Sequence, residues 1–253
     1  MMRVCTFNVN SIRSRLEIVQ NLVKEYDIDV LCMQEIKVEN KDFPLIDSDF
    51  ECIVHGQKRL NGVATCSKYP IEKYQKGFDG ELSEARFIYT LINEIHIINI
   101  YAPLGDNYGE RFEYKIYFYD KLFEYLKRFD LENERVLICG DFNISHTELD
   151  VWDEEIWEGE VTHLPEERAI LSKFLEIGFI DIIREKFKNE KVFTFYDYRG
   201  AAVYKNEGLR LDYILVTKPL FEKFKDVEIL TSIRRKRKPT PSDHVPVIAE
   251  FDI

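Results

Sequence analysis

Short apolar runs separated by polar turns recur along the whole chain and predict about ten β-strands. The runs cover residues 3–9, 30–34, 50–55, 63–67, 87–93, 96–101, 136–139, 211–216, 227–230 and 245–251. Strands of this length and number suit a pair of packed sheets, each burying one face against the other.

Three longer segments carry apolar residues at every third or fourth position, which predicts amphipathic helices. They are residues 12–26, 112–129 and 166–177, and the last is entered through Pro165, a residue suited to the first turn of a helix. Helices and strands alternate early in the chain, and longer loops separate the later strands. We therefore predict an α/β fold, a four-layer sandwich in which helices flank two packed mixed β-sheets.

Composition narrows the class of protein. The chain has 253 residues, 45% of them hydrophobic and 13% aromatic, which is enough for a sizeable core and excludes a disordered or fibrous protein. It contains no repeat, low-complexity tract or Pro/Ser-rich linker, so we expect one domain over residues 1–253. No apolar run reaches about 18 residues, and no apolar signal core precedes the first charges, so we expect a cytoplasmic protein without a membrane span.

The cysteines are five in number, and none of them forms a close pair with zinc-site spacing. Cys5, Cys32, Cys66 and Cys139 lie inside short apolar runs, and Cys52 lies beside one. We expect all five to be free, small buried side chains in a reducing compartment.

Charge is distributed unevenly along the chain. Lys and Arg total 35 and Asp and Glu total 46, a net charge of -11, which argues against a protein that coats nucleic acid non-specifically. It does not exclude an enzyme that concentrates acid around metal ions. Residues 234–238 reverse the sign with five adjacent cations. This run is either a phosphate-contacting segment or a solvated loop or nuclear-targeting signal.

Polar side chains stand where the predicted strands begin or end. Asn8, Glu35 and Tyr101 close three strands, Asp141 follows a fourth, and the pair Asp243-His244 precedes the last. Each alone is compatible with ordinary turn or cap chemistry. Together they offer the oxygen ligands that hard divalent cations prefer, a base for a water nucleophile and a donor for developing negative charge. This set indicates phosphoester hydrolysis.

The chain resembles the exonuclease III type of apurinic/apyrimidinic (AP) endonuclease, within the endonuclease–exonuclease–phosphatase superfamily. The matching stretches, in the order of the family, are FNVNSIR (7–13), LCMQEIK (31–37), NGVATCSK (61–68), INIYAP (98–103), GDFN (140–143), TFYDYR (194–199), GLRLDYIL (208–215) and SDHVPV (242–247). GDFN and SDH indicate only the superfamily, whereas QEIK, NGVA and LRLDY point to its DNA-repair branch.

The resemblance implies a metal site and a catalytic set. Glu35 would bind Mg²⁺, or Mn²⁺ in its place, with help from Asn8 and Asp243. The catalytic residues that it implies are Tyr101, Asp141, Asn143, Asp212 and His244.

In that set Asp141 would activate or orient the water, and Asn143 would bond the phosphate. His244 would donate to the attacked phosphoryl oxygen, and Asp212 would orient His244 and hold its charge. Tyr101 would either bond the phosphate or, as a phenolate, act as the nucleophile.

The resemblance also implies how DNA is held. Phe195, Leu209 and Leu211 would line a small apolar pocket for an abasic sugar, although all three also suit a core. Side chains expected to contact DNA are Arg13, Lys37, Asn40, Lys41, Lys115, Arg199, Arg234, Arg235, Lys236 and Arg237. Three positions depart from the family pattern: Ser11 replaces a glycine, Leu104 an asparagine and Tyr196 a tryptophan.

The implied activity is Mg²⁺-dependent incision 5′ to abasic sites in double-stranded DNA, leaving a 3′-hydroxyl, by a monomer with no membrane partner. Removal of 3′ blocking groups and a 3′→5′ exonuclease would accompany it. Two alternatives stay open: a phosphoesterase of the same superfamily acting on inositol phosphates, sphingomyelin or an RNA tail, and a non-catalytic DNA-binding module.

Overall fold

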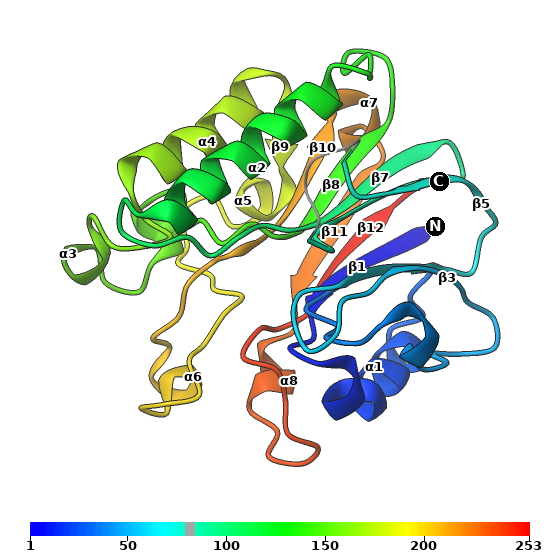
Figure 1. Cartoon of the computed structure of the whole chain (residues 1–253), viewed down its shortest axis with the longest axis horizontal. Helices are drawn as coiled ribbons and strands as arrows, with labels where there is room; N and C mark the ends of the chain where they lie inside the picture. Colours follow the sequence, from blue (N-terminus) through cyan, green and yellow to red (C-terminus); the bar gives the residue numbers. More distant parts are fainter. Residues whose placement is uncertain (79–83) are drawn as a thin grey trace.

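The computed structural model describes residues 1–78 and 84–253, which form two six-stranded sheets packed face to face (Figure 1). The first sheet has the strand order β11-β12-β1-β2-β4-β3. Its strands are β1 (Met2–Asn8), β2 (Val30–Gln34), β3 (Glu51–His55), β4 (Val63–Ser67), β11 (Phe224–Ile229) and β12 (Val247–Phe251). β1 and β2 pair in parallel and the other neighbours pair antiparallel, so the sheet is mixed.

The second sheet has the order β5-β6-β7-β8-β10-β9 and is also mixed, because β7 and β8 run parallel. Its strands are β5 (Ile71–Lys76), β6 (Phe87–Ile92), β7 (Ile95–Tyr101), β8 (Val136–Asp141), β9 (Phe179–Asp181) and β10 (Asp212–Thr217). All ten predicted strands are present. β5 and β9 were not predicted, because β5 is mostly exposed and polar and β9 has only three residues.

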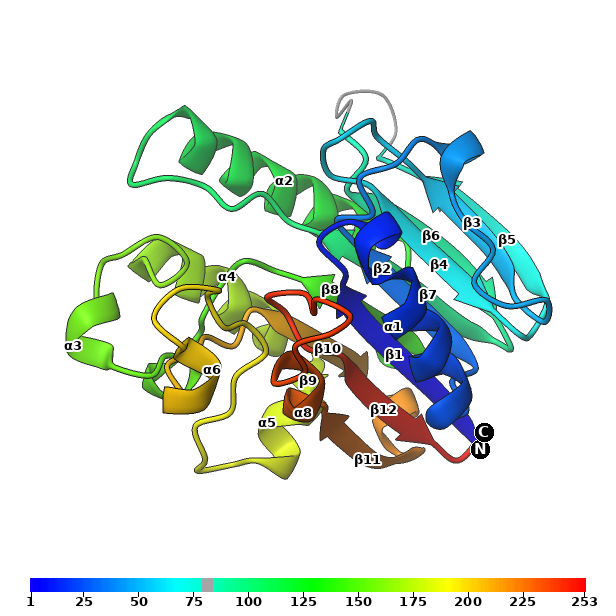
Figure 2. The same ribbon diagram turned by 90° about the horizontal axis from the view of Figure 1, so that it is seen from below.

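Helices cover the outer face of each sheet (Figure 2). α1 (Ile12–Glu25) packs Val19 and Leu22 against the first sheet, and α2 (Glu110–Leu126) and α4 (Pro165–Glu176) cover the second. Aliphatic side chains from both inner faces, such as Val4 and Ile214, fill the space between the sheets. These four layers confirm the predicted fold class. In the described part of the chain, no helix has the length and apolar character to span a bilayer.

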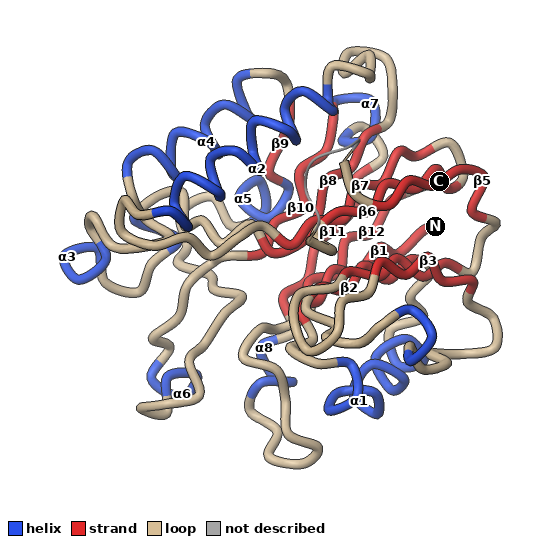
Figure 3. The backbone as a smooth tube through the Cα atoms, viewed as in Figure 1, coloured by secondary structure: helices blue, strands red, loops and turns tan. Residues whose placement is uncertain are grey.

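Shorter helices lie in the loops. They are η1 (Asn40–Asp42), η2 (Glu148–Asp150), α3 (Glu154–Trp157), α5 (Ile182–Lys186), α6 (Ala202–Lys205), α7 (Lys218–Phe221) and α8 (Thr231–Arg234). The loops that carry α6 and α8 project from the same side of the molecule (Figure 3).

Strand register places the polar strand ends together. Asn8 pairs with Gln34 at the parallel ends of β1 and β2, so Asn8 and Glu35 are neighbours. In the other sheet Asp141 pairs with both Tyr101 and Asp212. Since β1 of one sheet packs against β8 and β10 of the other, both sets meet at one end of the sandwich.

The expectation of five free cysteines is wrong for two of them. Cys52 and Cys66 lie directly opposite each other on β3 and β4 and form a disulfide with a Cα–Cα distance of 4.0 Å. The sequence separation of 14 residues did not reveal this contact, because it depends on strand register. Cys5, Cys32 and Cys139 are free and buried, as predicted.

Candidate active site

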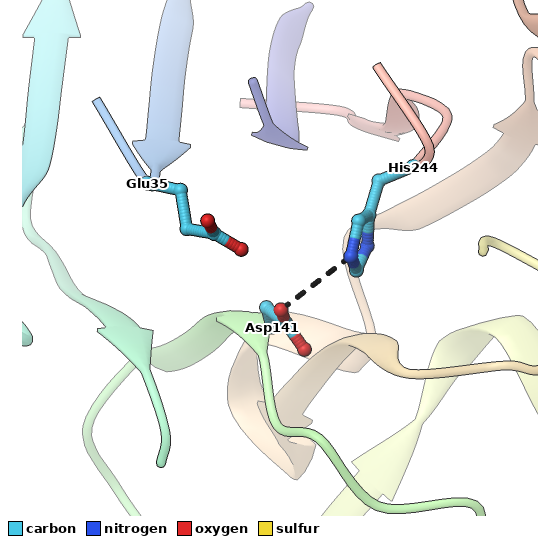
Figure 4. Close-up of side chains that lie close together, drawn as sticks. All are labelled: Glu35, Asp141 and His244. Atoms are coloured by element: carbon cyan, nitrogen blue, oxygen red, sulfur yellow. Dashed lines mark ion pairs between the residues drawn. The ribbon is translucent and has the colours of Figure 1, made fainter. Parts of the chain in front are cut away.

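Three side chains from different strand ends form the centre of the site: Glu35, Asp141 and His244 (Figure 4). One ligand atom from each lies within 4.8 Å of the others. Asp141 is the last residue of β8, and Glu35 follows β2 with a left-handed φ of 50°. Left-handed backbone is uncommon for residues other than glycine and concentrates at functional sites.

The amide of Asn8 joins the two carboxylates. Its Nδ2 donates to Glu35 Oε1 and to Asp141 Oδ2, both at 2.9 Å. Its Oδ1 accepts the backbone N–H of Asn10 at 3.0 Å, which fixes the orientation of the amide. Asn8 therefore bridges the two carboxylates through its Nδ2.

His244 lies between two buried aspartates. Its Nδ1 is 2.7 Å from Asp212 Oδ2, and its Nε2 is 3.6 Å from Asp141 Oδ2. Burial alone would lower the pKa of His244, but the two carboxylates raise it to about 10. The ring is therefore an imidazolium at neutral pH, with Nε2 directed toward Asp141. The predicted pairing of Asp212 with His244 is present.

The surroundings of Asp141 disfavour the ionised form of its carboxyl group. Burial, together with the charges of Asp212 and Glu35, raises its pKa to about 7, against the opposing effect of His244. A carboxylate whose pKa lies near neutral pH suits general base catalysis. The Asp212 Oδ1 atom is also buried without a hydrogen-bond partner. The carboxylate oxygens in this site are therefore more numerous than the cations and hydrogen-bond donors that could compensate them.

The same excess of acid fits a divalent cation. Burial opposes the charge of Glu35, but hydrogen bonds from Lys37, at 2.8 Å, and Asn8 lower its pKa. Glu35 and Asp141 thus offer adjacent carboxylate oxygens, the ligands that hard cations prefer. His244 is the third member of this group, and the aspartates beside it favour its protonated form. Across the described ranges, no other group of three or more ligating side chains comes together.

Asp243 lines the same cavity, but its Oδ1 accepts a hydrogen bond from Asn10 at 3.1 Å. Lys37 Nζ also reaches Asn10, at 2.6 Å. Asn10 thus links Asp243 to the lysine that bonds Glu35. We had not predicted a role for Asn10, although it lies within the FNVNSIR motif.

Tyr101 and Asn143 stand beside Asp141. Burial, followed by the charges of Glu35 and Asp141, raises the pKa of the Tyr101 phenol well above its usual value. The phenol therefore stays protonated, which favours phosphate binding over the phenolate alternative. Asn143 has a left-handed φ of 51°. Its backbone N–H donates a hydrogen bond to Asp141 Oδ1, and its side-chain amide donates one to the carbonyl oxygen of Ala102.

The backbone around Asp141 depends on a glycine. Gly140 has φ 133°, and a Cβ atom there would stand 2.0 Å from the carbonyl oxygen of Ile100. Only glycine permits this approach of β8 to β7. Ser11 adopts φ 86°, a left-handed backbone conformation that residues other than glycine seldom adopt.

A cavity of about 390 Å³ opens over these groups. Phe195, Leu209 and Leu211 form its apolar side, so the structure brings the three predicted pocket residues together. The Phe195 ring lies edge-on to His244, with ring centroids 5.2 Å apart. Trp157 also lines the cavity. It lies outside the motifs, and nothing in its sequence context indicated this position.

The expectation that Lys115 contacts DNA is wrong. Its side chain has no exposed surface, and its Nζ pairs with Glu167 at 2.5 Å. The same ammonium donates to the carbonyl oxygens of Asn143 and Leu104, at 2.6 and 3.0 Å. Burial lowers the pKa of Lys115. Its role is to hold the two loops that flank the cavity.

The other predicted DNA-contacting residues differ in accessibility. Arg234 is half-buried, donates to the backbone carbonyls of Tyr196 and Asp197, and stacks 4.7 Å from the Tyr198 ring centroid. It therefore supports the neighbouring loop. Asn40 Oδ1 accepts the Gly56 N–H. The exposed residues of this set are Arg13, Asn40, Lys41, Arg199, Arg235, Lys236 and Arg237.

The histidines outside the motifs also have structural partners. His163 is buried between Ser145 and Glu154, and His96 stacks on Tyr89. We had expected surface or turn positions. His163 lies in a turn, although it is buried, whereas His96 lies within β7 and is half-buried, so His96 differs from that expectation. None of these rings reaches the cavity.

Comparison with known proteins gives concordant matches. Residues 5–244 match the model of the endonuclease/exonuclease/phosphatase family. Exodeoxyribonuclease III of Haemophilus influenzae is 35% identical, over 99% of this chain and all of the relative. An AP endonuclease structure from Archaeoglobus fulgidus superposes with a TM-score of 0.95 at 39% identity, covering both chains completely. A Neisseria 3′ phosphatase bound to a product DNA hairpin reaches the same TM-score at 31% identity, again over both complete chains.

Proposed function

Because the chain belongs to the endonuclease/exonuclease/phosphatase family, we propose that it is a DNA-repair nuclease that incises 5′ to abasic sites and removes blocked or normal nucleotides from 3′ ends. The relatives named above are an exodeoxyribonuclease, an AP endonuclease and a 3′ phosphatase, and these activities break the same kind of phosphoester bond. We assign all of them to one site.

One observation carries this proposal. Three groups converge beside a cavity with one apolar side: the imidazolium of His244, the carboxyl of Asp141, whose pKa is about 7, and the carboxylate of Glu35. Hydrolysis of a phosphodiester needs a proton acceptor for water and donors for the negative charge that grows on phosphorus-bound oxygens. The site supplies both within one hydrogen-bonded group.

The residues act as follows in the proposed reaction. Asp141 accepts a proton as the water oxygen attacks phosphorus. His244 and Tyr101 donate hydrogen bonds to the non-bridging oxygens, and Asp212 keeps the imidazolium oriented and charged. The bond between phosphorus and the 3′-oxygen breaks, and that oxygen leaves as a hydroxyl after taking a proton from solvent water. The products are a 3′-hydroxyl and a 5′-phosphate.

Glu35 and Asp141 would hold the divalent cation, which we propose to be Mg²⁺. When bound, the cation neutralises phosphate charge and polarises the oxygens at the reacting centre. Lys37 and Asn8 would keep the Glu35 carboxylate ionised and oriented for this role. Mn²⁺, which accepts similar oxygen ligands, would substitute.

The substrate would be double-stranded DNA carrying an abasic site or a blocked 3′ end. The sugar without a base would enter beside Phe195, Leu209 and Leu211, since a missing base makes extrusion of the nucleotide less costly. Exposed cations, including Arg235, would contact the phosphates on either side. We further propose a monomeric, cytoplasmic enzyme in which residues 1–253 act as one catalytic domain.

The proposal is tested with a 5′-labelled duplex that contains one abasic site, in Mg²⁺ and in EDTA. We expect a single Mg²⁺-dependent cut 5′ to the site, leaving a 3′-hydroxyl that a DNA polymerase extends. An intact duplex, combined with turnover of an inositol phosphate, sphingomyelin or RNA tail, would replace this proposal with the phosphoesterase alternative. Salt-sensitive binding without any turnover would support a binding module.

A further inference from the structure

A second hollow adjoins the active-site cavity and has no part in the reaction described above. It measures about 410 Å³ and shares Trp157, Phe195, Asp197 and Leu209 with that cavity. Each hollow falls within the range of about 300–1,000 Å³ that small-molecule sites occupy. The chain contains two tryptophans, Trp152 and Trp157, and both line this hollow.

The walls of the hollow come from separate segments. Trp157 ends α3, and Ala202 begins α6, so both helices contribute to the lining of the hollow. Trp152 packs against the apolar cluster of Phe193, and its backbone N–H bonds to the Gly208 carbonyl at 3.1 Å. The tryptophan positions are therefore held by α3 and by the strand-like pairing next to Leu209.

The lining suits a flat, polar-edged aromatic ring. Phe195 and the two tryptophans offer π faces, on which nucleobases stack without regard to sequence. The charged residues in the lining are Asp197, Arg199 and Glu207, and Arg199 pairs with Asp197 at 2.9 Å.

Position identifies which base this would be. In the proposed reaction, the sugar on the 3′ side of the cut phosphodiester sits against Phe195 and Leu209. Both residues also form the boundary of the second hollow. A base attached to that sugar would therefore extend past them toward Trp152.

We propose that the hollow between Trp152 and Trp157 binds the nucleobase of the nucleotide on the 3′ side of the cut when the enzyme removes a base-bearing nucleotide from a 3′ end. This inference rests on the proposed nuclease function and specifies its substrate class. Trp152, which lines only the second hollow, would be a specificity-determining residue, whereas Leu211 lines only the catalytic cavity.

The first test compares two substrates in the same protein. Full-length wild type, Trp152→Leu and Trp152→Phe are assayed on a duplex with one abasic site and on a duplex with an unmodified recessed 3′ end. We expect Trp152→Leu to lower kcat/KM for the recessed end about tenfold relative to the abasic duplex, the effect of losing one base–aromatic stack. Trp152→Phe, which keeps a π face, should restore the ratio.

Leu211→Ala is the matched control: it alters the wall for the sugar, which both substrates carry, so it should lower kcat/KM on both and leave their ratio close to that of wild type. Thermal melts establish that each variant is folded. An unchanged ratio in Trp152→Leu, with abasic cleavage intact, overturns the base-binding inference and leaves the nuclease proposal standing. Failure of wild type to cut either duplex overturns the nuclease proposal instead.

The second test measures binding of a base in the hollow without catalysis. Because both tryptophans line it, intrinsic fluorescence reports its occupancy. Asp141→Asn protein is titrated with a recessed duplex and with the same duplex ending in an abasic sugar. We expect the base-bearing end to quench the tryptophan emission more strongly at saturation. Equal quenching by the two ends would show that no base enters the hollow.

Discussion

Two buried clusters of charged side chains, near each other in sequence, differ in the balance of their charges. In the structural cluster, Arg210 bonds Asp150 and Asp181, both at 2.6 Å, and Arg184 bonds Asp150 at 2.5 Å. Two arginines thus meet two aspartates, and despite burial the pKa of Asp150 is held well below its usual value, chiefly by Arg210.

The active-site cluster also combines buried carboxylates with cations, but without that balance. Glu35, Asp141 and Asp212 face a single imidazolium and the ammonium of Lys37, and the pKa of Asp141 rises to about 7. Asp141 and Asp150 are nine positions apart and both are buried. Burial alone therefore does not mark a functional carboxylate. The direction of its pKa shift, set by whether cations compensate it, separates the two clusters.

The largest effect should come from breaking the imidazolium pair. Asp212→Asn keeps the shape of the side chain but removes the charge that orients His244, and we expect kcat on abasic DNA to fall about 10²- to 10⁴-fold. Groups that act as a unit are not additive. The double variant Asp212→Asn/His244→Gln should therefore be little slower than the slower single variant. Additive losses would show that the two residues act separately.

Breaking the structural cluster, in which the charges balance, should lower the stability of the fold and leave the catalytic rate nearly unchanged. Arg210→Met leaves Asp150 and Asp181 buried with fewer partners, and we expect it to lower the free energy of unfolding by about 3–5 kcal/mol. Denaturant unfolding measures this change. The specific activity of the folded fraction should stay within a few-fold of wild type. A loss as large as that of Asp212→Asn would contradict the separation of the clusters.

A divalent cation should stabilise the protein by binding at the active-site cluster and not at the structural cluster. At 100 times its dissociation constant, a cation that binds the folded state alone adds about 2.7 kcal/mol. We expect Mg²⁺ to raise the Tm of wild type and of Arg210→Met, and to leave Glu35→Gln nearly unaffected. Equal rises in all three proteins would place the cation elsewhere.

Low pH should weaken the structural cluster. The lowered pKa of Asp150 means that its ionised form stabilises the fold. This contribution is complete above the unfolded value of about 3.9 and is lost as pH falls through the lower folded value. We expect Asp150→Asn to be less stable than wild type at pH 6, with the difference narrowing below about pH 4. A difference that is constant with pH would rule out this carboxylate as the source.

Much of the fold was predictable because apolar periodicity records burial directly. Val30–Gln34 and Val63–Ser67 were predicted with the observed bounds, since both strands are buried along their whole length. β5 was missed because an edge strand with exposed side chains lacks that periodicity. The Cys52–Cys66 disulfide was missed because it depends on the register between two strands.

The site was predictable to the extent that motifs carry it. Glu35, Asp141, Asp212 and His244 do meet, whereas Lys115 is sealed beside Glu167 although its sequence context resembles that of an exposed cation. Sequence does not state which face of a helix is covered by another helix. Arg210 lies inside the LRLDY motif, but its partner Asp150 lies outside the motifs, so the balanced cluster was not foreseen.

The single-turnover rate of Asp141→Asn on a duplex with one abasic site, in Mg²⁺, tests the central claim most directly. Its control is Asp120→Asn, which alters an exposed carboxylate on α2. We predict that Asp141→Asn cleaves at least about 10²-fold more slowly, while remaining as stable as wild type, and that Asp120→Asn cleaves at the wild-type rate. Cleavage by Asp141→Asn at the wild-type rate would contradict the account.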